Sequence, residues 1–370
     1  MKPLRIATDT SAQPQGAETQ WLLAPLLDPS LATEPSERLY RRIYRHYYRA
    51  AADLFALTPL EDADVALVSA DWSTYQGSFS WLARSDRAAI GRARDFAERA
   101  RRLGKPVAVF FTGERSHERV PLPGAWVFRK SMYRSRRGPR DVMVPEVFYL
   151  DLLEQLGMET IEERPWVAKP SVGFCGMARR RQASEYLGQL AFFLTHLARE
   201  GSPGVSPYIG VELRLRALEV LQASNLVSSK FIVRDKSVFY GSENKANRER
   251  VRREFLDNIQ GADYQLALRG SANYSYRPWE AMCVGRPPLF IDTDCVWPFE
   301  DEVDWSKLLV RVDESDLARL PEALLDAHSM LDDARFRELQ RACRATWERY
   351  LTPLGLARWL RDFLAERVAR

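Results

Sequence analysis

Short apolar runs alternate with longer amphipathic segments over the first part of the chain. Residues 36–56 and 85–103 repeat apolar side chains every three or four positions and predict helices, the second of which ends at Gly104. Three apolar runs predict buried strands, at Leu4–Thr8, Val65–Ser69 and Val107–Phe111. This order of strands and helices favours a parallel sheet covered by helices.

The pattern changes near residues 158–166, and a second series of strands and helices follows. A strand over Trp166–Lys169 is expected to lead into a loop at Gly173–Gly176. Further helices are predicted at 184–199, 211–223, 246–260 and 278–284, further strands at 230–233, 238–240, 264–268, 288–291 and 308–312, and a mostly helical C-terminus from 331. We therefore expect a domain over 1–160, a second over 161–345 and a final helix over 346–370.

Composition narrows the class of protein. The 370 residues are 46% hydrophobic, which suits two globular domains. No apolar run approaches the ~18–20 residues that span a bilayer, and the N-terminus lacks the apolar core of a signal peptide. The four scattered cysteines fit free thiols in a reducing compartment, so we expect a cytoplasmic protein. A net charge of only +4 gives no reason to expect a nucleic-acid partner.

The most informative stretch is Tyr264–Val312. A buried strand ends in Arg269-Gly270, and a polar loop then leads to a helix that begins near Pro278 and is closed by Gly285. A loop that follows a parallel strand lies at the carboxyl edge of the sheet, where open α/β folds bind ligands. The N–H groups and partial positive charge of the helix start favour a phosphate there.

Two side chains at this helix start extend the prediction. Arg277 can form a charge-assisted pair with a diphosphate, and Glu280 projects from the same end of the helix and can accept hydrogen bonds from two ribose hydroxyls. An Arg-x-x-Glu pair on its own is more often a surface ion pair. Within this strand, loop and helix we interpret it as a cradle for a nucleoside diphosphate.

The same stretch resembles the C-terminal part of exostosin-type glycosyltransferases. That family shows Arg-Gly, Ser-x-Arg-x-x-Glu-Ala, Gly-x-x-Pro, and Pro-Phe-x-Asp followed by Asp-Trp-Ser-Lys. The matching residues are Arg269-Gly270, Ser275-Tyr-Arg277-Pro-Trp-Glu280-Ala, Gly285-Arg-Pro-Pro, and Pro298-Phe299 with Asp304-Trp305-Ser306-Lys307. Specific matching covers about residues 250–315, with a weaker echo at Ala51–Asp64. The chain is shorter than the animal members and lacks their membrane anchor and second catalytic domain, so we expect a bacterial relative.

The resemblance implies a GT-B fold, in which two Rossmann-like domains flank a cleft and C-terminal helices pack back towards the first domain. It also implies an inverting transferase without a cofactor or an obligatory metal. The nucleotide sugar, with UDP as the expected nucleotide, would be held by the second domain, and a polysaccharide or lipid-linked glycan acceptor mainly by the first. The donor residues would be Arg269, Gly270, Ser275, Tyr276, Arg277 and Glu280. The alternatives are a GT-B transferase for another class of nucleotide sugar and a catalytically silent nucleotide-binding assembly subunit.

The general base is expected in the first domain, after a strand. Asp9, Asp71, Glu114 and His117 each follow a predicted strand, although a capping or surface role also fits each of them. Glu114 and His117 rank ahead of the others because Thr112-Gly113 predicts a sharp turn directly after a buried strand.

Four further features each have two interpretations. Gly173 and Gly176, followed by Arg179–Arg181, form either a second phosphate-facing loop or an ordinary turn, and Asp292-Thr293-Asp294 fits a loop at the cleft better than a metal site. The basic aromatic helix 38–49 could make peripheral contact with an anionic membrane, although packing on a sheet is favoured. The basic loop 129–140 is either mobile surface charge or a grip on an anionic acceptor.

Overall fold

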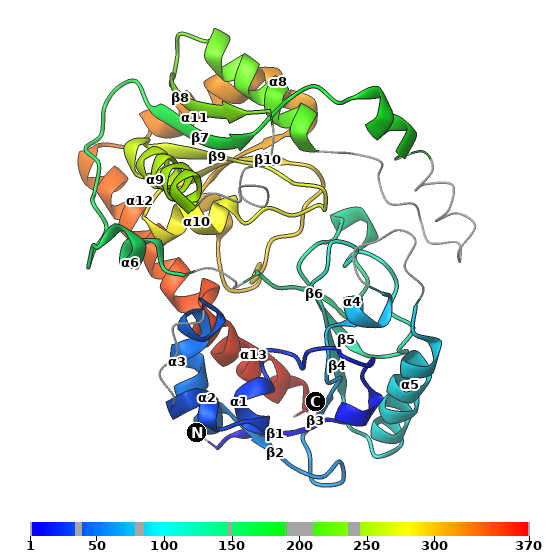
Figure 1. Ribbon diagram of the computed structural model, residues 1–370. Coiled ribbons are helices and arrows are strands. Elements are labelled where there is room, and N and C mark those ends of the chain that lie inside the picture. The colour runs from blue at the N-terminus through cyan, green and yellow to red at the C-terminus, as the bar shows by residue number, and fades with distance from the viewer. Residues whose placement is uncertain are drawn as a thin grey trace. The chain divides into compact units, whose positions relative to one another are not determined.

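The computed structural model describes residues 2–33, 39–77, 85–146, 150–188, 190, 210–235 and 245–368. The chain divides into two compact α/β units (Figure 1). The first unit contains Met1–Leu150, Val296–Phe299 and Arg349–Arg370, and the second contains Asp151–Cys295 and Glu300–Glu348. The division falls at Leu150 rather than at residue 160, since Asp151 pairs with Arg344 and the Leu152 N–H donates to the Cys283 Sγ.

The sheet of the first unit has six parallel strands in the order β2-β1-β3-β4-β5-β6. The strands are β1 Leu4–Ala7, β2 Phe55–Leu57, β3 Val65–Leu67, β4 Val107–Phe111, β5 Trp126–Arg129 and β6 Asp141–Met143. The predicted strands β1, β3 and β4 are confirmed. The helix predicted over 36–56 ends earlier, at Leu54, because Phe55 enters the sheet and pairs with Leu4.

Helices cover this sheet. They are α1 Ala24–Leu27, α2 Ser30–Thr33, α3 Leu39–Leu54, α4 Trp72–Tyr75, α5 Arg87–Arg102 and α13 Pro353–Val368, with 3-10 turns η1 Thr10–Ala12 and η2 Arg134–Arg136. Along α5, Ala89, Ala93, Phe96 and Ala100 repeat at helical spacing and are buried in the core. The C-terminal helix α13 packs against α3, as the expected return of the C-terminal helices to the first domain requires.

The aromatic residues of α3 belong to the core. Ile43, Tyr44, Tyr47 and Tyr48 are buried, and the Tyr47 hydroxyl donates to the Leu22 carbonyl. The tyrosines therefore form the packed side of an amphipathic helix and are not available as an apolar face for lipid. Within the described ranges, every helix is too short or too polar to cross a bilayer.

The second unit contains a five-stranded parallel sheet in the order β11-β10-β9-β7-β8. The strands are β7 Ser171–Met177, β8 Ser228–Arg234, β9 Tyr264–Ala267, β10 Pro288–Asp292 and β11 Val310–Asp313. The prediction of a strand at Trp166–Lys169 followed by a loop at Gly173–Gly176 is wrong, because the glycines themselves lie in β7. Val167 is 44% exposed, whereas Val172 and Phe174 are buried between helices.

The helices of the second unit confirm most of the predicted pattern. They are α6 Leu152–Leu156, α8 Gly210–Ala223, α9 Lys245–Gly261, α10 Arg277–Cys283, α11 Leu320–Ser329 and α12 Asp333–Thr346, with η3 Trp305–Lys307, η4 Glu314–Arg319 and η5 Trp347–Leu351. The predicted strand 238–240 and most of the predicted helix 184–199 lie outside the described residues. Two parallel sheets with covering helices confirm the α/β class with two Rossmann-like domains.

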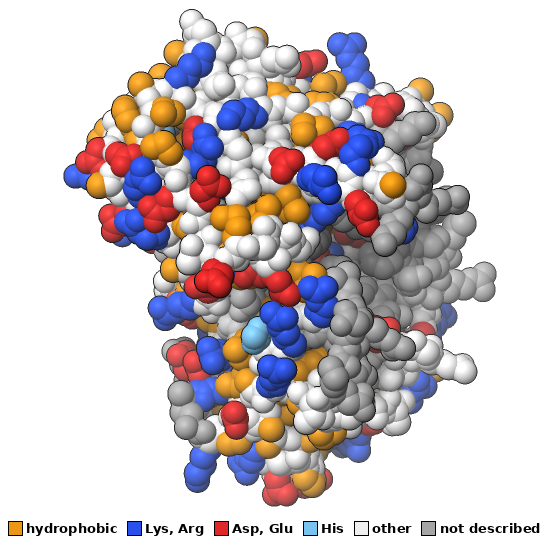
Figure 2. All heavy atoms as spheres, turned by 60° about the vertical axis from the view of Figure 1, so that its left-hand side comes forward, with side chains coloured by type: hydrophobic (Ala, Val, Ile, Leu, Met, Phe, Trp, Pro, Cys, Tyr) orange, Lys and Arg blue, Asp and Glu red, His pale blue; other side chains and the backbone are white. Residues whose placement is uncertain are grey.

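Charges of both signs are mixed over the described surface. On the face in Figure 2, acidic and basic side chains alternate, with small apolar areas between them. This mixture agrees with the small net charge of +4.

Candidate functional site

The helix α10 is buried within the second unit. Trp279, Ala281, Met282 and Cys283 are buried, and Gly285, at φ +72°, reverses the chain after the helix. An added Cβ at Gly285 would also lie 2.7 Å from the Ile161 Cδ1 and 3.1 Å from the Gln340 carbonyl oxygen, so a side chain there would be strained and Ile161 would have to shift. The helix begins at Arg277, one residue before the predicted start, with Pro278 in its first turn.

Arg277 is held in place by three neighbours. Its Nη1 lies 3.2 Å from the Glu280 Oε2, and its Nη2 donates to the Cys175 carbonyl at 2.9 Å. Its guanidinium carbon lies 4.6 Å from the centre of the Phe255 ring on α9. The side chain is 20% exposed, so the guanidinium is pre-positioned by β7 and α9 and still reaches solvent.

Glu280 is the buried partner. Its side chain is 6% exposed, and its Oε2 is ion-paired but has no hydrogen-bond donor among the described residues. Burial raises the pKa of Glu280, while the positive charges of Arg277 and Arg252 oppose that rise. A buried carboxylate oxygen without a donor costs free energy that a ligand hydroxyl would recover.

The two glycines of β7 have different surroundings. An added Cβ at Gly176 would lie 3.7 Å from the Arg277 Nη2, so this glycine borders the Arg277 guanidinium. An added Cβ at Gly173 would lie 2.3 Å from the Gln265 Nε2 and 2.8 Å from the Ala262 Cβ. Gly173 therefore permits close packing inside the sheet, and its surroundings do not support a contact with phosphate.

The loop after β9 is braced by the start of α8. Arg269 is 3% exposed and donates to the Ser271 carbonyl, so its guanidinium lies beneath the loop. Arg214 donates to the Arg269 carbonyl at 3.0 Å, and the Gly210 N–H donates to the Gly270 carbonyl at 3.3 Å. An added Cβ at Gly210 would lie 2.3 Å from the Arg269 carbonyl oxygen. This brace was missed by sequence reasoning, because its hydrogen bonds join residues 55 and 60 positions apart along the chain, and such pairs carry no local signal.

The residues directly before α10 shape its entry. The Ser275 Oγ accepts a hydrogen bond from the Arg277 N–H at 3.3 Å, and the Tyr276 ring lies 6.3 Å from the Tyr274 ring. The Ser275 and Tyr276 side chains are half-buried beside Arg277. Ser275 thus satisfies a backbone group that the first turn of a helix leaves unpaired.

The Asp292-Thr293-Asp294 segment is tied into the sheet. The Asp292 carboxylate accepts the Cys295 N–H at 2.8 Å and pairs with Arg311, while the Thr293 hydroxyl donates to the Asn273 Oδ1 at 2.7 Å. Among the described residues, no three His, Cys, Asp or Glu side chains gather as a metal site would require. The contacts of Asp292 agree with a structural loop.

In the first unit, Asp71 has a structural role. Its Oδ1 accepts the Ser73 N–H and hydroxyl, and its Oδ2 accepts the Thr112 N–H at 2.8 Å and hydroxyl at 2.6 Å. Four hydrogen bonds occupy both carboxylate oxygens and join the ends of β3 and β4. These contacts give Asp71 a role in joining the two strand ends, and its assignment as a base stays a prediction.

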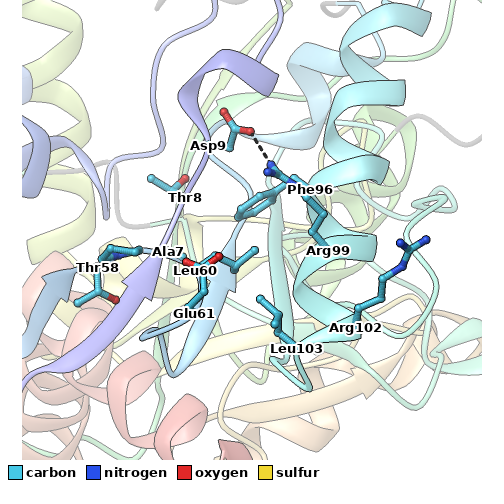
Figure 3. A pocket seen from close by; sticks show the side chains of 11 residues that line it. Ala7, Thr8, Asp9, Thr58, Leu60, Glu61, Phe96, Arg99, Arg102 and Leu103 are labelled. Carbon is cyan, nitrogen blue, oxygen red and sulfur yellow. Dashed lines mark hydrogen bonds and ion pairs between the residues drawn. The ribbon is translucent and has the colours of Figure 1, made fainter.

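Asp9 caps η1 and forms an ion pair with Arg99 of α5 (Figure 3). Its Oδ1 accepts the Ser11 N–H at 3.1 Å, and its Oδ2 pairs with Arg99 at 3.2 Å. It follows β1, and a cavity opens beside it. Asp9 and Asp71 follow neighbouring strands, but their carboxylates have separate partners.

Glu114 belongs to a cluster around a buried lysine. The Lys130 side chain is 7% exposed, and its Nζ lies 3.1 Å from the Glu146 Oε2 and 3.5 Å from the Glu114 Oε1. The Glu146 and Glu114 side chains are 28% and 46% exposed, so the carboxylates lie nearer to solvent than the ammonium. Burial raises the pKa of Glu146, and the charge of Lys130 opposes the rise. His117 lies close by in sequence, and its ring meets Tyr133 edge-on at 5.9 Å.

Strand order brings this cluster together. Glu114, Lys130 and Glu146 follow β4, β5 and β6, which are neighbours in the sheet. Glu146 and Lys130 were missed in the sequence, where residues 129–140 read as a single basic loop. Arg129 in fact lies within β5, where it pairs with Asp141 at 2.6 Å and donates to the Glu118 carbonyl.

No protein-family model matches the chain. A segment of 104 residues, 28% of the chain, is 29% identical to Exostosin-1 of Drosophila melanogaster and covers 13% of that protein. A segment of 105 residues is 28% identical to the Exostosin-1 homolog of Caenorhabditis elegans and covers 26% of it. The chain thus spans a small part of these curated relatives, and the resemblance to exostosins is confirmed over that part.

Solved structures give weaker similarities. The crystal structure of TarM has 12% identity and a TM-score of 0.31, covering 70% of this chain and 54% of that one. A glycosyltransferase from Rickettsia africae has 8% identity and a TM-score of 0.37, covering 100% and 99%. At such low TM-scores, the fold class rests on the two sheets of the chain itself.

Proposed function

We propose that this exostosin-like chain is an inverting glycosyltransferase that moves a sugar from a UDP-sugar to a hydroxyl of a glycan acceptor. The observation that carries the proposal is the Arg277–Glu280 pair on α10. A guanidinium held by β7 and α9 lies beside a buried carboxylate whose Oε2 has no hydrogen-bond donor among the described residues. The two groups have the chemistry that a diphosphate and a ribose need, in a segment with exostosin-like motifs.

The proposed donor contacts divide between the two side chains. Arg277 would contact the diphosphate, because a planar guanidinium pairs well with phosphate oxygens. Glu280 would accept the ribose hydroxyls. The present ion pair at 3.2 Å would then loosen, and Glu280 would exchange part of its interaction with Arg277 for ribose hydrogen bonds. Gly176 borders the guanidinium, so the backbone of β7 would lie close to the bound phosphate.

The proposed reaction breaks the bond between the anomeric carbon and the diphosphate oxygen. The acceptor oxygen bonds to the anomeric carbon, its proton passes to a carboxylate, and UDP leaves with the bonding electrons. Arg277 would stabilise the charge that develops on the diphosphate. The carboxylates proposed for the proton are Glu146 and Glu114, and His117 stays a further proposal.

Lys130 is suited to hold Glu146, one of the proposed bases, in position. Burial moves the pKa of Glu146 upward, towards the range in which a general base works well, and the ammonium of Lys130 opposes that rise and favours the ionised form. Lys130 itself lies behind the carboxylates and would act on the acceptor only through them. It is therefore a positioning residue in this proposal.

A screen of nucleotide sugars tests the function. UDP should raise the melting temperature more than ADP or GDP, and one or more UDP-sugars should be slowly hydrolysed without an acceptor. Arg253, exposed on α9 of the same unit, supplies a control variant, since Arg253→Ala should leave both effects unchanged. In another outcome, UDP stabilises the protein while no UDP-sugar is turned over, either alone or in the presence of a set of glycan acceptors. That result would instead favour a silent binding subunit. Absence of any effect of UDP would refute the donor site.

The cellular setting is part of the same proposal. All four cysteines are buried free thiols, which fits a reducing compartment and action on the cytoplasmic side. A lipid-linked acceptor would require contact with a membrane surface. Binding to vesicles with and without anionic lipid would test that contact directly.

A further inference from the structure

A second guanidinium lies at the proposed donor site, on a different helix from Arg277. Arg252 is half-buried on α9, and its Nε donates to the Gln155 Oε1 of α6 at 2.8 Å. Its guanidinium carbon lies 5.0 Å from the centre of the Phe255 ring, which the guanidinium carbon of Arg277 approaches to 4.6 Å. Two arginines from separate helices therefore share one buried aromatic ring.

The charge of Arg252 acts on Glu280. Burial raises the pKa of Glu280, and the positive charges of Arg277 and Arg252 oppose that rise. Two guanidiniums beside one carboxylate give this group of side chains a net positive charge, which suits the approach of an anion. Arg252 is thus part of the electrostatic environment of the carboxylate, although it lies on α9 and not on α10.

Other ionisable groups around α10 have partners of their own. The helix packs against α6, α12, β9 and β10. In or next to these elements, the following groups pair with each other: Asp151 with Arg344, Asp292 with Arg311, and the Tyr264 hydroxyl with His328. Among the described residues, Arg277 and Arg252 are therefore the cations that favour the ionised form of Glu280.

The proposed donor contacts would separate these two cations. When Arg277 turns towards the diphosphate, its ion pair with Glu280 loosens, and the diphosphate brings further negative charge near the carboxylate. A buried carboxylate without a nearby cation takes up a proton, and it is then a weaker acceptor for ribose hydroxyls. Arg252 is held by Gln155 and Phe255, so its charge stays near Glu280 through this exchange.

We propose that Arg252 is a positioning residue of the donor site, which keeps Glu280 a carboxylate after Arg277 has turned to the diphosphate. This role rests on the proposed function, because it concerns the complex with UDP. A direct contact between Arg252 and the diphosphate would be a different role. A purely structural link between α9 and α6 through Gln155 would be another, and the pH dependence of UDP binding separates the three.

Arg252→Gln removes the charge and keeps a polar side chain. In the free variant Arg277 still pairs with Glu280, but in its UDP complex the carboxylate would lack both cations. UDP binding to the variant should therefore take up as much as one proton more than UDP binding to the parent protein. The affinity of the variant should fall relative to the parent as pH rises, with a loss of about tenfold at pH 8 and a much smaller loss at pH 5.

Isothermal titration of the full chain with UDP, between pH 5 and pH 8 and in buffers of different ionisation enthalpy, gives the affinity and the proton count. Arg252→Met keeps the apolar stem against Phe255 and should behave like Arg252→Gln, which provides a second variant if one of them folds poorly. Arg252→Lys keeps the charge and should restore most of the affinity at pH 8. In the double variant Arg252→Gln/Glu280→Gln, the additional proton should disappear, since Glu280 is the group that takes it up.

Arg253 supplies the matched control, because it is exposed on the same helix and carries the same charge. Arg253→Gln should bind UDP with the affinity and proton count of the parent. A loss of equal size at every pH, without additional proton uptake, would show a direct contact between Arg252 and the diphosphate and overturn the proposal. Equal losses for uridine and UDP, or a lower free energy of unfolding with unchanged UDP binding, would show a structural link and also overturn it. Failure of the parent protein to bind UDP would instead refute the proposed function itself.

Discussion

Replacing Glu280 with glutamine should weaken UDP binding without weakening the fold. Glu280 is 6% exposed, and its Oε2 has no hydrogen-bond donor among the described residues. Glutamine has nearly the same volume and removes the buried charge. A structural ion pair with Arg277 would predict the opposite outcome, a loss of stability with no effect on the nucleotide.

The direction of the stability change follows from the pKa. Burial raises the pKa of Glu280 in the folded state above the unfolded value of about 4.3. The folded state then holds more protons than the unfolded state in the pH range between the two values, so stability falls as pH rises through that range. Each unit of upward shift costs about 1.4 kcal/mol once the pH exceeds the folded pKa. Glu280→Gln is free of this cost. The variant should therefore have a larger free energy of unfolding than the parent protein at pH 7, and the difference should vanish below the pKa of Glu280 in the unfolded chain.

The effect on UDP follows from the lost hydrogen bonds. Glu280→Ala should weaken UDP binding by about 2–3 kcal/mol, roughly 30- to 150-fold, because bonds to an ionised acceptor are lost. Glutamine keeps one carbonyl acceptor, so Glu280→Gln should lose roughly fivefold, about 1 kcal/mol. Urea unfolding at pH 7 and pH 4 gives the stability, and isothermal titration gives the affinity.

Glu254 on α9 provides a matched control, because its pKa is shifted downward whereas that of Glu280 is shifted upward. It pairs with Arg234 and Arg250 at 31% exposure, and hydrogen bonds from Arg234 hold its pKa below the usual value. Glu254→Gln should therefore lose up to about 1 kcal/mol at pH 7 and bind UDP normally. If Glu280→Gln behaved like Glu254→Gln in both assays, the assignment of Glu280 to the ribose would be refuted.

Four further predictions follow from the same contacts. Arg277→Ala should weaken UDP far more than uridine, measured by titration, and equal losses would count against a phosphate contact. Asp71→Asn should lower the free energy of unfolding by about 2 kcal/mol in urea while UDP binds normally, since the new amide faces the Thr112 donors. Gly173→Ala should cost about 1–3 kcal/mol through the clash with Gln265, and a stable variant would show that the strand can shift. Lys130→Met should raise the pKa of Glu146 further, so the acid limb of the pH–rate profile should move to higher pH. An unmoved limb would exclude Glu146 as the base.

Local periodicity was enough to predict the frame of the donor site. The run Tyr264–Ala267, the glycine at 285 and the proline at 278 define a strand, a helix and their connection by short-range rules, and the structure agrees within a residue or two. The Arg277–Glu280 proximity also follows from sequence, because residues three apart on a helix lie on one face.

Contacts between segments that lie far apart in the sequence could not be predicted by these short-range rules. Gly173 reads as a loop residue by its conformational freedom, yet it lies in β7, where it pairs with Lys230 and Gln265 and where a side chain would collide with Gln265 and Ala262. Phe55 reads as the last turn of a helix, yet it begins β2, because pairing with Leu4 buries it in the sheet. Each outcome depended on a neighbour far along the chain.

The first unit shows most clearly which features follow from local sequence and which from tertiary packing. The sequence determined by itself that carboxylates follow several strands, since strands and their ends have local signatures. Only the tertiary structure decided which of them act together, by placing β4, β5 and β6 side by side so that Lys130 lies between Glu114 and Glu146, and by occupying Asp71 with Thr112. The physical reason is that neighbours on a helix are set by a fixed local geometry, whereas neighbours across a sheet depend on the packing of the whole unit.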